Sequence, residues 1–244
     1  MRRILGLLLL SLSFAAASAD LHMLTDNHPP LHFERNGEIV GFAVDVVRAL
    51  AEQEGDNIRI EREPLLRALA DGSSAANTGL FTILRTPERE RRYLWVGPLM
   101  DVETAFYGRS DSSSQVRTLD EARAVPRIVV PRKWVAYAQL QALGFTNLYG
   151  VDSPEQMMRL LKLGRTDLIV TDTLTAATLA GEEGLPPDML RYQMPLASQG
   201  SYIAFSLQTD WQVAARWQAA LEAMRKDGRL QQLRQRWKLD QPLR

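Results

Sequence analysis

Apolar positions along the chain follow two patterns in turn. Short apolar runs have the length of buried strands, and between them lie segments whose apolar residues repeat at helical spacing. In 42–54, for example, Val46, Val47 and Leu50 share one helical face, and Gly55 follows as a terminating residue. This alternation predicts an α/β protein. The expected strands are 21–24, 58–60, 79–84, 104–107, 127–130, 167–170 and 201–207, and the expected helices are 42–54, 65–70, 134–143, 154–163, 173–180, 211–226 and 230–237.

Three local signals add detail to this pattern. Asn36-Gly37 is the strongest short signal for a β-hairpin in the chain. Ser153-Pro154-Glu155-Gln156 is a capping box with proline at the first helical position, and it predicts a helix start. In 211–226, Trp211 and Trp217 stand at helical spacing, so we expect both side chains in the core.

The order of the elements indicates two βα-rich units between which the chain crosses twice, near 104–109 and near 195–201. We therefore expect a two-lobed protein with two hinge crossings. Lobe 1 would comprise 20–107 plus 199–244, and lobe 2 would comprise 108–198. Ligands of such folds bind between the lobes, at the carboxyl ends of strands and at helix N-termini.

The first 19 residues have the pattern of a secretory signal peptide. Arg2 and Arg3 precede the apolar run 4–10, and the small residues 17–19 form a cleavage site that makes Asp20 the expected mature N-terminus. The apolar run is shorter than the roughly 20 residues of a membrane-spanning helix. Because the chain has no cysteine to carry a lipid, we expect a periplasmic protein that is not a lipoprotein.

Charge and composition argue against several classes of function. The chain has 29 basic and 29 acidic residues, and without Arg2 and Arg3 the mature chain has 27 against 29. We therefore expect no nucleic-acid partner. With no cysteine, and with its three histidines at 22, 28 and 32, the chain predicts no metal site, no cofactor and no Ser–His or Cys nucleophile.

The segment Thr86-Pro87-Glu88-Arg89 follows an expected strand and has the pattern of a helix start, with threonine as N-cap and proline at the first helical position. Arg89 would then lie in the first turn, where the helix dipole disfavours a cation. A positive side chain at a positive helix end indicates an anionic ligand between them, and a small carboxylate would fit. The alternative is a solvated surface arginine balanced by Glu88 and Glu90.

Four blocks, in order, resemble the family 3 solute-binding proteins, the periplasmic receptors for polar amino acids in ABC importers, which have the type II binding-protein fold. The first block is Gly41-Phe42 with Val44-Asp45-Val46 and Leu50-Ala51, preceded by Asn36-Gly37-Glu38. The others are Thr86-Pro87-Glu88-Arg89 with Trp95-Val96-Gly97-Pro98, Gly164-Arg165-Thr166-Asp167 leading to Asp172, and Met224-Arg225-Lys226-Asp227-Gly228 with Trp237. The run Asn77 to Phe81 resembles a divergent subgroup of this family.

The resemblance implies a set of ligand-binding residues. Arg89 matches the arginine that grips the α-carboxylate, and Thr82 matches a hydroxyl that assists it. Asp172 matches the carboxylate that takes the α-ammonium from the opposite lobe, although it could instead cap the helix expected at 173. His28 stands near the position of an aromatic residue that covers the ligand, and Trp134 would be a lid or a core anchor.

The chain departs from the family pattern at Pro131-Arg132-Lys133-Trp134, where a glycine followed by serine or threonine is usual. This bulk and these two cations predict a ligand more anionic than a simple amino acid, or an occluded site. His28 in place of an aromatic ring is a second departure.

The resemblance implies a monomeric, non-enzymatic protein that closes its lobes around an amino acid or a related small carboxylate. Its expected partner is an inner-membrane ABC permease or a membrane sensor. Two alternatives remain open. One is a dehydratase-like enzyme that acts on small carboxylates, and the other is a ligand-dependent regulator of a sensor kinase.

Overall fold

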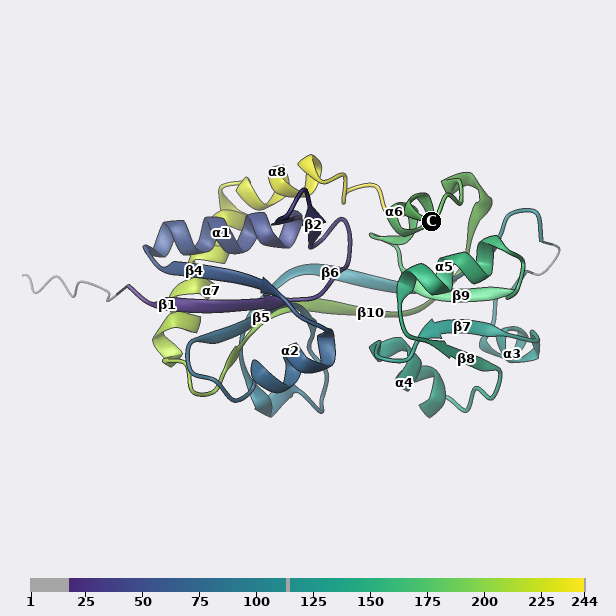
Figure 1. Cartoon of the computed structure of the whole chain (residues 1–244), viewed down its shortest axis with the longest axis horizontal. Coiled ribbons are helices and arrows are strands. Elements are labelled where there is room, and N and C mark those ends of the chain that lie inside the picture. The colour runs from purple at the N-terminus through teal and green to yellow at the C-terminus, as the bar shows by residue number, and fades with distance from the viewer. Residues whose placement is uncertain (1–17, 113–114, 244) are drawn as a thin grey trace, which may run out of the picture.

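The computed structural model describes residues 18–112 and 115–243. Residues 1–17, most of the predicted signal peptide, lie outside the described part. Figure 1 shows two lobes side by side, which confirms the predicted α/β, two-lobed architecture. One eight-stranded sheet runs through both lobes in the order β4-β1-β5-β10-β6-β9-β7-β8.

The lobe that contains the N-terminal strand is built on parallel pairs of β1 with β4 and with β5. Helix α1 lies along one face of these strands together with α7 and α8, while α2 lies on the other face (Figure 1). The elements of this lobe are β1 Asp20–Thr25, β2 Phe33–Arg35, β3 Glu38–Val40, α1 Phe42–Glu54, β4 Asn57–Arg62, α2 Leu65–Asp71, β5 Thr78–Leu84, the 3-10 helix η1 Glu90–Arg92, α7 Trp211–Lys226 and α8 Arg229–Arg236.

The other lobe has a second set of parallel strands, in which β7 pairs with both β8 and β9. Its helices pack against these strands and enclose two apolar clusters of its own. Its elements are α3 Leu119–Ala124, β7 Ile128–Pro131, α4 Val135–Ala142, β8 Leu148–Val151, α5 Pro154–Lys162, β9 Leu168–Asp172, α6 Ala176–Glu182 and the 3-10 helix η2 Pro187–Met189.

Two long strands connect the lobes. β6 (Tyr93–Arg109) and β10 (Leu190–Ser206) have 17 residues each and pair antiparallel along most of their length. In Figure 1 they run through the waist of the molecule, where the sequence places its two crossings. The exact lobe boundaries stay a prediction.

The C-terminal segment is a third connection between the lobes. After α8 it crosses to the second lobe and ends beside α6 (Figure 1). There the Leu243 N–H donates to the Thr173 carbonyl at 2.9 Å, and the Tyr107 hydroxyl donates to the Leu243 carbonyl at 2.6 Å. These two hydrogen bonds therefore hold the end of the C-terminal segment on the second lobe.

The hairpin, the end of the first helix and the capping box are confirmed. The hairpin of β2 and β3 turns at Asn36 and Gly37, which both have positive φ angles (54° and 81°), as a type I′ turn requires. Helix α1 ends at Gly55 in the left-handed conformation. The Ser153 side chain accepts a hydrogen bond from the Gln156 N–H at the start of α5.

The larger apolar cluster of the N-terminal lobe lies between the sheet and helices α1 and α7. Trp217 is fully buried there, and its indole N–H donates to Asp56 at 2.8 Å. The prediction for Trp211 is wrong, because this side chain is 66% exposed. It is the first residue of α7, directly after the N-cap Asp210, so the apolar face of the helix begins after it.

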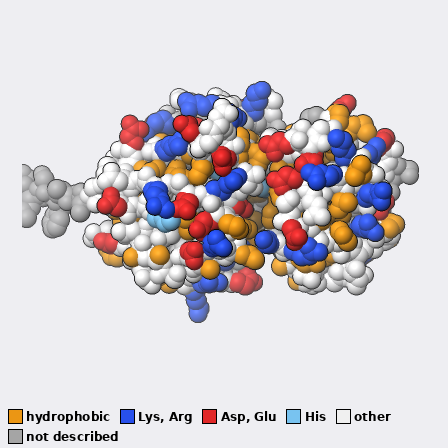
Figure 2. Space-filling view, viewed as in Figure 1, with side chains coloured by type: hydrophobic (Ala, Val, Ile, Leu, Met, Phe, Trp, Pro, Cys, Tyr) orange, Lys and Arg blue, Asp and Glu red, His pale blue; other side chains and the backbone are white. Residues whose placement is uncertain are grey.

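Among the described residues, no helix is both long and apolar enough to cross a membrane. Figure 2 shows acidic and basic side chains interspersed over both lobes on the face it displays. On that face, no large area of one charge is visible for a polyanion to bind.

Candidate functional site

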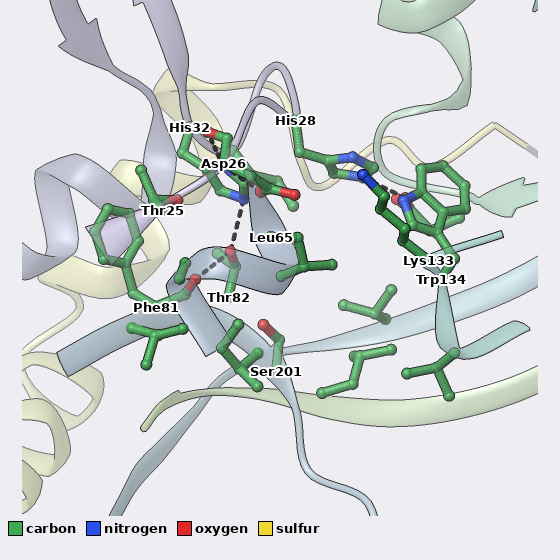
Figure 3. A pocket seen from close by; sticks show the side chains of 18 of the residues that line it. Thr25, Asp26, His28, His32, Leu65, Phe81, Thr82, Lys133, Trp134 and Ser201 are labelled. Carbon is green, nitrogen blue, oxygen red and sulfur yellow. Dashed lines mark hydrogen bonds and ion pairs between the residues drawn. The ribbon is translucent and has the colours of Figure 1, made fainter. Parts of the chain in front are cut away.

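A cavity of about 120 Å³ lies between the lobes and receives side chains from both. Most of its wall is apolar. All five of the predicted site residues line it, although their role in binding stays a prediction. The polar residues of the wall are Thr25, Asp26, His28, His32, Thr82, Arg89, Thr104, Lys133, Asp172 and Ser201. Figure 3 shows most of these side chains from close by.

Arg89 reaches the cavity from a turn and not from a helix. The predicted helix start at Thr86 is wrong, because the chain makes one turn there and a three-residue 3-10 helix follows it. The Arg89 and Glu90 N–H groups donate to the Thr86 carbonyl at 3.0 and 2.9 Å, and the strand β6 then begins. Position 89 is therefore set by the turn after β5, directly before the 3-10 helix η1, and no α-helix begins there.

The guanidinium of Arg89 is a partly buried cation without a counter-charge. It donates one hydrogen bond, from Nη1 to the Leu84 carbonyl at 3.2 Å. Burial lowers the pKa of Arg89, and neighbouring Tyr93 and Glu88 act in the opposite direction. Arg89 forms no ion pair with any part of the chain that the structure describes. Most of its five N–H groups are thus available to an anion.

Asp172 ends β9 in the second lobe, and His28 reaches it from the loop after β1 in the first lobe. The His28 Nε2 lies 2.9 Å from Asp172 Oδ2, and the Thr175 hydroxyl donates to the same oxygen at 2.6 Å. The other oxygen, Oδ1, accepts from the N–H groups of Leu174 and Thr175 at 3.0 and 2.9 Å. Asp172 therefore organises the turn before α6 and also joins the lobes.

The pKa shifts of His28 and Asp172 favour opposite charges on the pair. Burial acts to lower the pKa of His28, but the hydrogen bond and charge of Asp172 outweigh it and raise the pKa. Burial acts to raise the pKa of Asp172, and His28 and Thr175 together bring it below its ordinary value. The His28 imidazole, whose raised pKa favours the protonated form, therefore occupies the place across from Asp172 that the resemblance gives to a ligand ammonium.

Thr82 lies on β5 at an irregular position of the sheet. Tyr202 pairs with Ile83 and Ile203 with Phe81, so Thr82 is an extra residue in a bulge. Its φ of 64° is uncommon for a β-branched residue and indicates backbone strain at the cavity wall.

The hydroxyl of Thr82 lies 2.6 Å from His32 Nε2 (Figure 3). Burial lowers the pKa of His32, which favours the neutral ring. Its Nδ1 lies 3.1 Å from the Asp26 carbonyl, which can only accept, so the ring proton is on Nδ1. Nε2 is then an acceptor, and the one proton of the Thr82 hydroxyl has two acceptors within reach, His32 Nε2 and the Phe81 carbonyl at 2.5 Å. Thr82 therefore offers lone pairs and no proton to the cavity.

Trp134 is the N-cap residue of α4 and closes the second-lobe side of the cavity. Its ring meets the His28 ring edge-on, with 5.3 Å between the centroids (Figure 3). Of the two cations before it, Arg132 pairs with Asp152 at the surface at 3.0 Å, whereas Lys133 lines the cavity. Trp134 thus contacts the interlobe ion pair directly.

The sequence model of the bacterial extracellular solute-binding proteins, family 3, matches residues 21–240. The chain belongs to this family. The predicted resemblance is thereby confirmed over almost the whole described chain. No curated protein matches the sequence.

Solved structures of the same fold cover most of this family member. One is a histidine kinase sensor domain with similarity to periplasmic binding proteins, at 23% identity, covering 89% of this chain and 95% of that one with a TM-score of 0.81. A mutant of ArgBP from T. maritima has 22% identity, 90% and 95% coverage and a TM-score of 0.76. The ancestral amino acid-binding protein AncCDT-1, a precursor of cyclohexadienyl dehydratase, has 18% identity, 89% and 95% coverage and a TM-score of 0.75.

The sequence interpretation missed five polar residues of this family member's cavity, namely Thr25, Asp26, His32, Thr104 and Ser201. His32 is buried and fixes both Asp26 and Thr82. The hydroxyls of Thr25 and Ser201 are buried without a hydrogen-bond partner in the described structure. Thr25 ends β1, and the rule that ligands bind at strand carboxyl ends was the available signal for it. No comparable signal marks Ser201.

Proposed function

We propose that this family 3 protein is a periplasmic solute-binding protein that captures an amino acid or a related small carboxylate between its lobes for an ABC importer. The observation that carries the proposal is Arg89, a partly buried cation on the wall of the interlobe cavity that forms no ion pair within the described chain. Such a group is stabilised when a carboxylate replaces the water it has lost.

Several further observations support binding by lobe closure. The cavity wall combines residues of the first lobe with Trp134, Lys133 and Asp172 of the second. The long strands β6 and β10 run from one lobe to the other beside the C-terminal segment, and the paired strands suit a hinge. Neighbouring structures include an ancestral arginine-binding protein bound to glutamine and an ancestral arginine-binding protein bound to arginine, which supports a small ligand of amino-acid size.

The test is a thermal-shift screen of the mature protein, beginning at Asp20, with amino acids, small monocarboxylates, dicarboxylates and polyamines. A ligand at one hundred times its dissociation constant adds about 2.7 kcal/mol of stability. For a domain of this size, that is a rise of roughly 5–11 °C in Tm. No shift from any carboxylate in the screen would refute the proposal.

A second candidate is a dehydratase-like enzyme. The ion pair of His28 and Asp172 in the cavity favours this candidate, because enzymatic proton transfer requires a positioned acid or base. The neighbour described as a precursor of cyclohexadienyl dehydratase points in the same direction. Incubation with prephenate, followed by its ultraviolet absorbance, tests this candidate: turnover that is lost in Asp172→Asn would establish it.

A third candidate is a sensory role, favoured by the neighbour described as a histidine kinase sensor domain. The ligand-bound protein would then bind a membrane sensor in place of a permease. Pull-down of each membrane protein by the ligand-loaded form distinguishes the two partners.

A further inference from the structure

Asp172 has no free acceptor position for a ligand. An ionised carboxylate offers about four lone-pair positions. Oδ1 accepts from two backbone N–H groups, those of Leu174 and Thr175, at 3.0 and 2.9 Å. Oδ2 accepts from His28 Nε2 at 2.9 Å and from the Thr175 hydroxyl at 2.6 Å. A ligand ammonium could reach this carboxylate only by displacing His28.

When His28 is protonated, as its raised pKa favours, the charges on the cavity wall add up to one excess positive charge. With His28 protonated, Asp172 and His28 cancel. Of the remaining charged groups, Arg89 and Lys133 are positive and Asp26 is negative. Neither Arg89 nor Lys133 forms an ion pair within the described chain, while Asp26 Oδ1 faces the His32 ring at 3.4 Å. A monoanion would neutralise the wall, whereas a zwitterion would leave the excess charge in place.

The rest of the wall suits a small acid with an apolar body. Thr25 and Ser201 are only 3% and 1% exposed, and the hydroxyl of each lacks a hydrogen-bond partner in the described structure. Both can donate to carboxylate oxygens. Figure 3 shows Ser201 below Thr82, among apolar side chains. The cavity of about 120 Å³ is smaller than the roughly 300–1,000 Å³ of sites for drug-sized ligands, so the ligand has few heavy atoms.

We infer that the ligand is a small monocarboxylate that carries no ammonium group, and that His28 is the residue that excludes amino acids by occupying their place on Asp172. This inference rests on the proposed function and narrows its ligand class. Arg89 binds the carboxylate, and the apolar wall takes the hydrocarbon part.

The experiment compares amino acids with the acids that lack their ammonium group: valine with 3-methylbutanoate, leucine with 4-methylpentanoate, and phenylalanine with 3-phenylpropanoate. Each probe is titrated into the mature protein by isothermal calorimetry near neutral pH. We expect at least one acid to bind about tenfold or more tightly than its amino acid, which corresponds to about 1.4 kcal/mol.

The outcomes separate the two proposals. If an amino acid binds as tightly as its acid or more tightly, the inference about ammonium is overturned and the proposed function stands. Loss of that amino-acid binding in Asp26→Asn would place the ammonium on Asp26. If none of the three acids binds but another carboxylate of the thermal-shift screen does, the inference is overturned and the proposed function stands. If no carboxylate of either set binds, both proposals are overturned.

Two variants test the role of His28. His28→Ala leaves Oδ2 of Asp172 without the imidazole and opens space beside Trp134. We expect it to bind the amino acid of the best pair about tenfold more tightly than the wild type does. His28→Gln is the matched control, because glutamine can keep an N–H donor on Asp172, and it should not gain this affinity.

Folding is checked by the thermal unfolding of each variant without ligand. If both variants unfold cooperatively and neither changes the preference between acid and amino acid, the assignment of His28 is overturned. If His28→Ala does not fold, His28→Gln alone tests the inference. In that variant the glutamine still donates to Asp172, so a preference for amino acids over acids would show that occupying Asp172 is not what excludes amino acids, and the inference would be overturned.

Discussion

Replacing Arg89 with glutamine removes the charge and the fork of donors while keeping a side chain of similar length. The wild-type guanidinium has five N–H groups and uses one on the Leu84 carbonyl, so four remain, enough for a bidentate carboxylate contact. Removing one partner of a desolvated charge pair costs about 2–5 kcal/mol of binding. Because Arg89 is only partly buried, we expect the lower part of that range, about 2–3 kcal/mol, or a roughly 30- to 140-fold rise in Kd.

The assay is calorimetric titration with the probe that binds best to the wild-type protein. Arg85→Gln is the matched control, because Arg85 lies in the same segment but pairs at the surface with Glu90 through Nε at 2.6 Å. We expect it to leave Kd within about twofold, as a surface pair contributes little. Arg89→Lys should be intermediate, since it keeps the charge but not the planar fork.

Two results would contradict this reasoning. A Kd for Arg89→Gln within about threefold of the wild type would show that Arg89 does not hold the carboxylate. An equal loss in Arg85→Gln would show that the segment matters for its conformation and that the charge of Arg89 has no special role.

Three further predictions concern stability. Asp56→Ala should lower the free energy of unfolding by about 2–4 kcal/mol, seen as a Tm roughly 4–16 °C lower, because it leaves the buried Trp217 indole N–H without its acceptor. Gly181→Ala should raise stability by about 0.5 kcal/mol in urea unfolding, since Gly181 is helical and a Cβ there meets nothing within 4 Å. The raised pKa of His28 means that its ion pair stabilises the fold fully below its unfolded value of 6.5 and loses this effect as the pH rises through the folded-state pKa. Wild-type protein should therefore lose more stability than His28→Gln between about pH 7 and pH 9. The lowered pKa of His32 affects stability below its ordinary value of 6.5, outside this range. Equal pH slopes would contradict an ion pair at this position.

The parts of the fold that the sequence predicts well are those determined by neighbouring residues. The strand expected at 79–84 is β5, and the helix between Gly41 and Gly55 is α1, because glycine conformation and apolar spacing are local properties. The hairpin at Asn36-Gly37 is predictable for the same reason. The two hinge crossings also follow from element order, although β6 and β10 are longer than the runs that marked them.

The errors and omissions occur where contacts between residues far apart in the sequence determine the local structure. Thr86 and Pro87 have the local pattern of a helix start, yet the chain needs to re-enter the sheet at Tyr93, and only a single turn and a 3-10 helix fit between the strands. His28 and Asp172 are 144 positions apart, so no local pattern relates them. The sequence predicts His28 and Asp172 as separate ligand-binding residues. Their contact with each other depends on how the two lobes are placed.

The ion pair of His28 and Asp172 links lobe closure to ligand choice. In a binding protein whose ligand bridges an arginine on one lobe and a carboxylate on the other, closure without ligand leaves both groups unpaired, so the ligand supplies most of the energy that shifts the population. In this protein, the ion pair of His28 and Asp172 joins the two lobes without a ligand. Closure then costs less, and a ligand with a single charged end can complete it through Arg89. The same contact removes the carboxylate that would recognise a second charged end, so easier closure and the loss of ammonium recognition are two effects of one side chain.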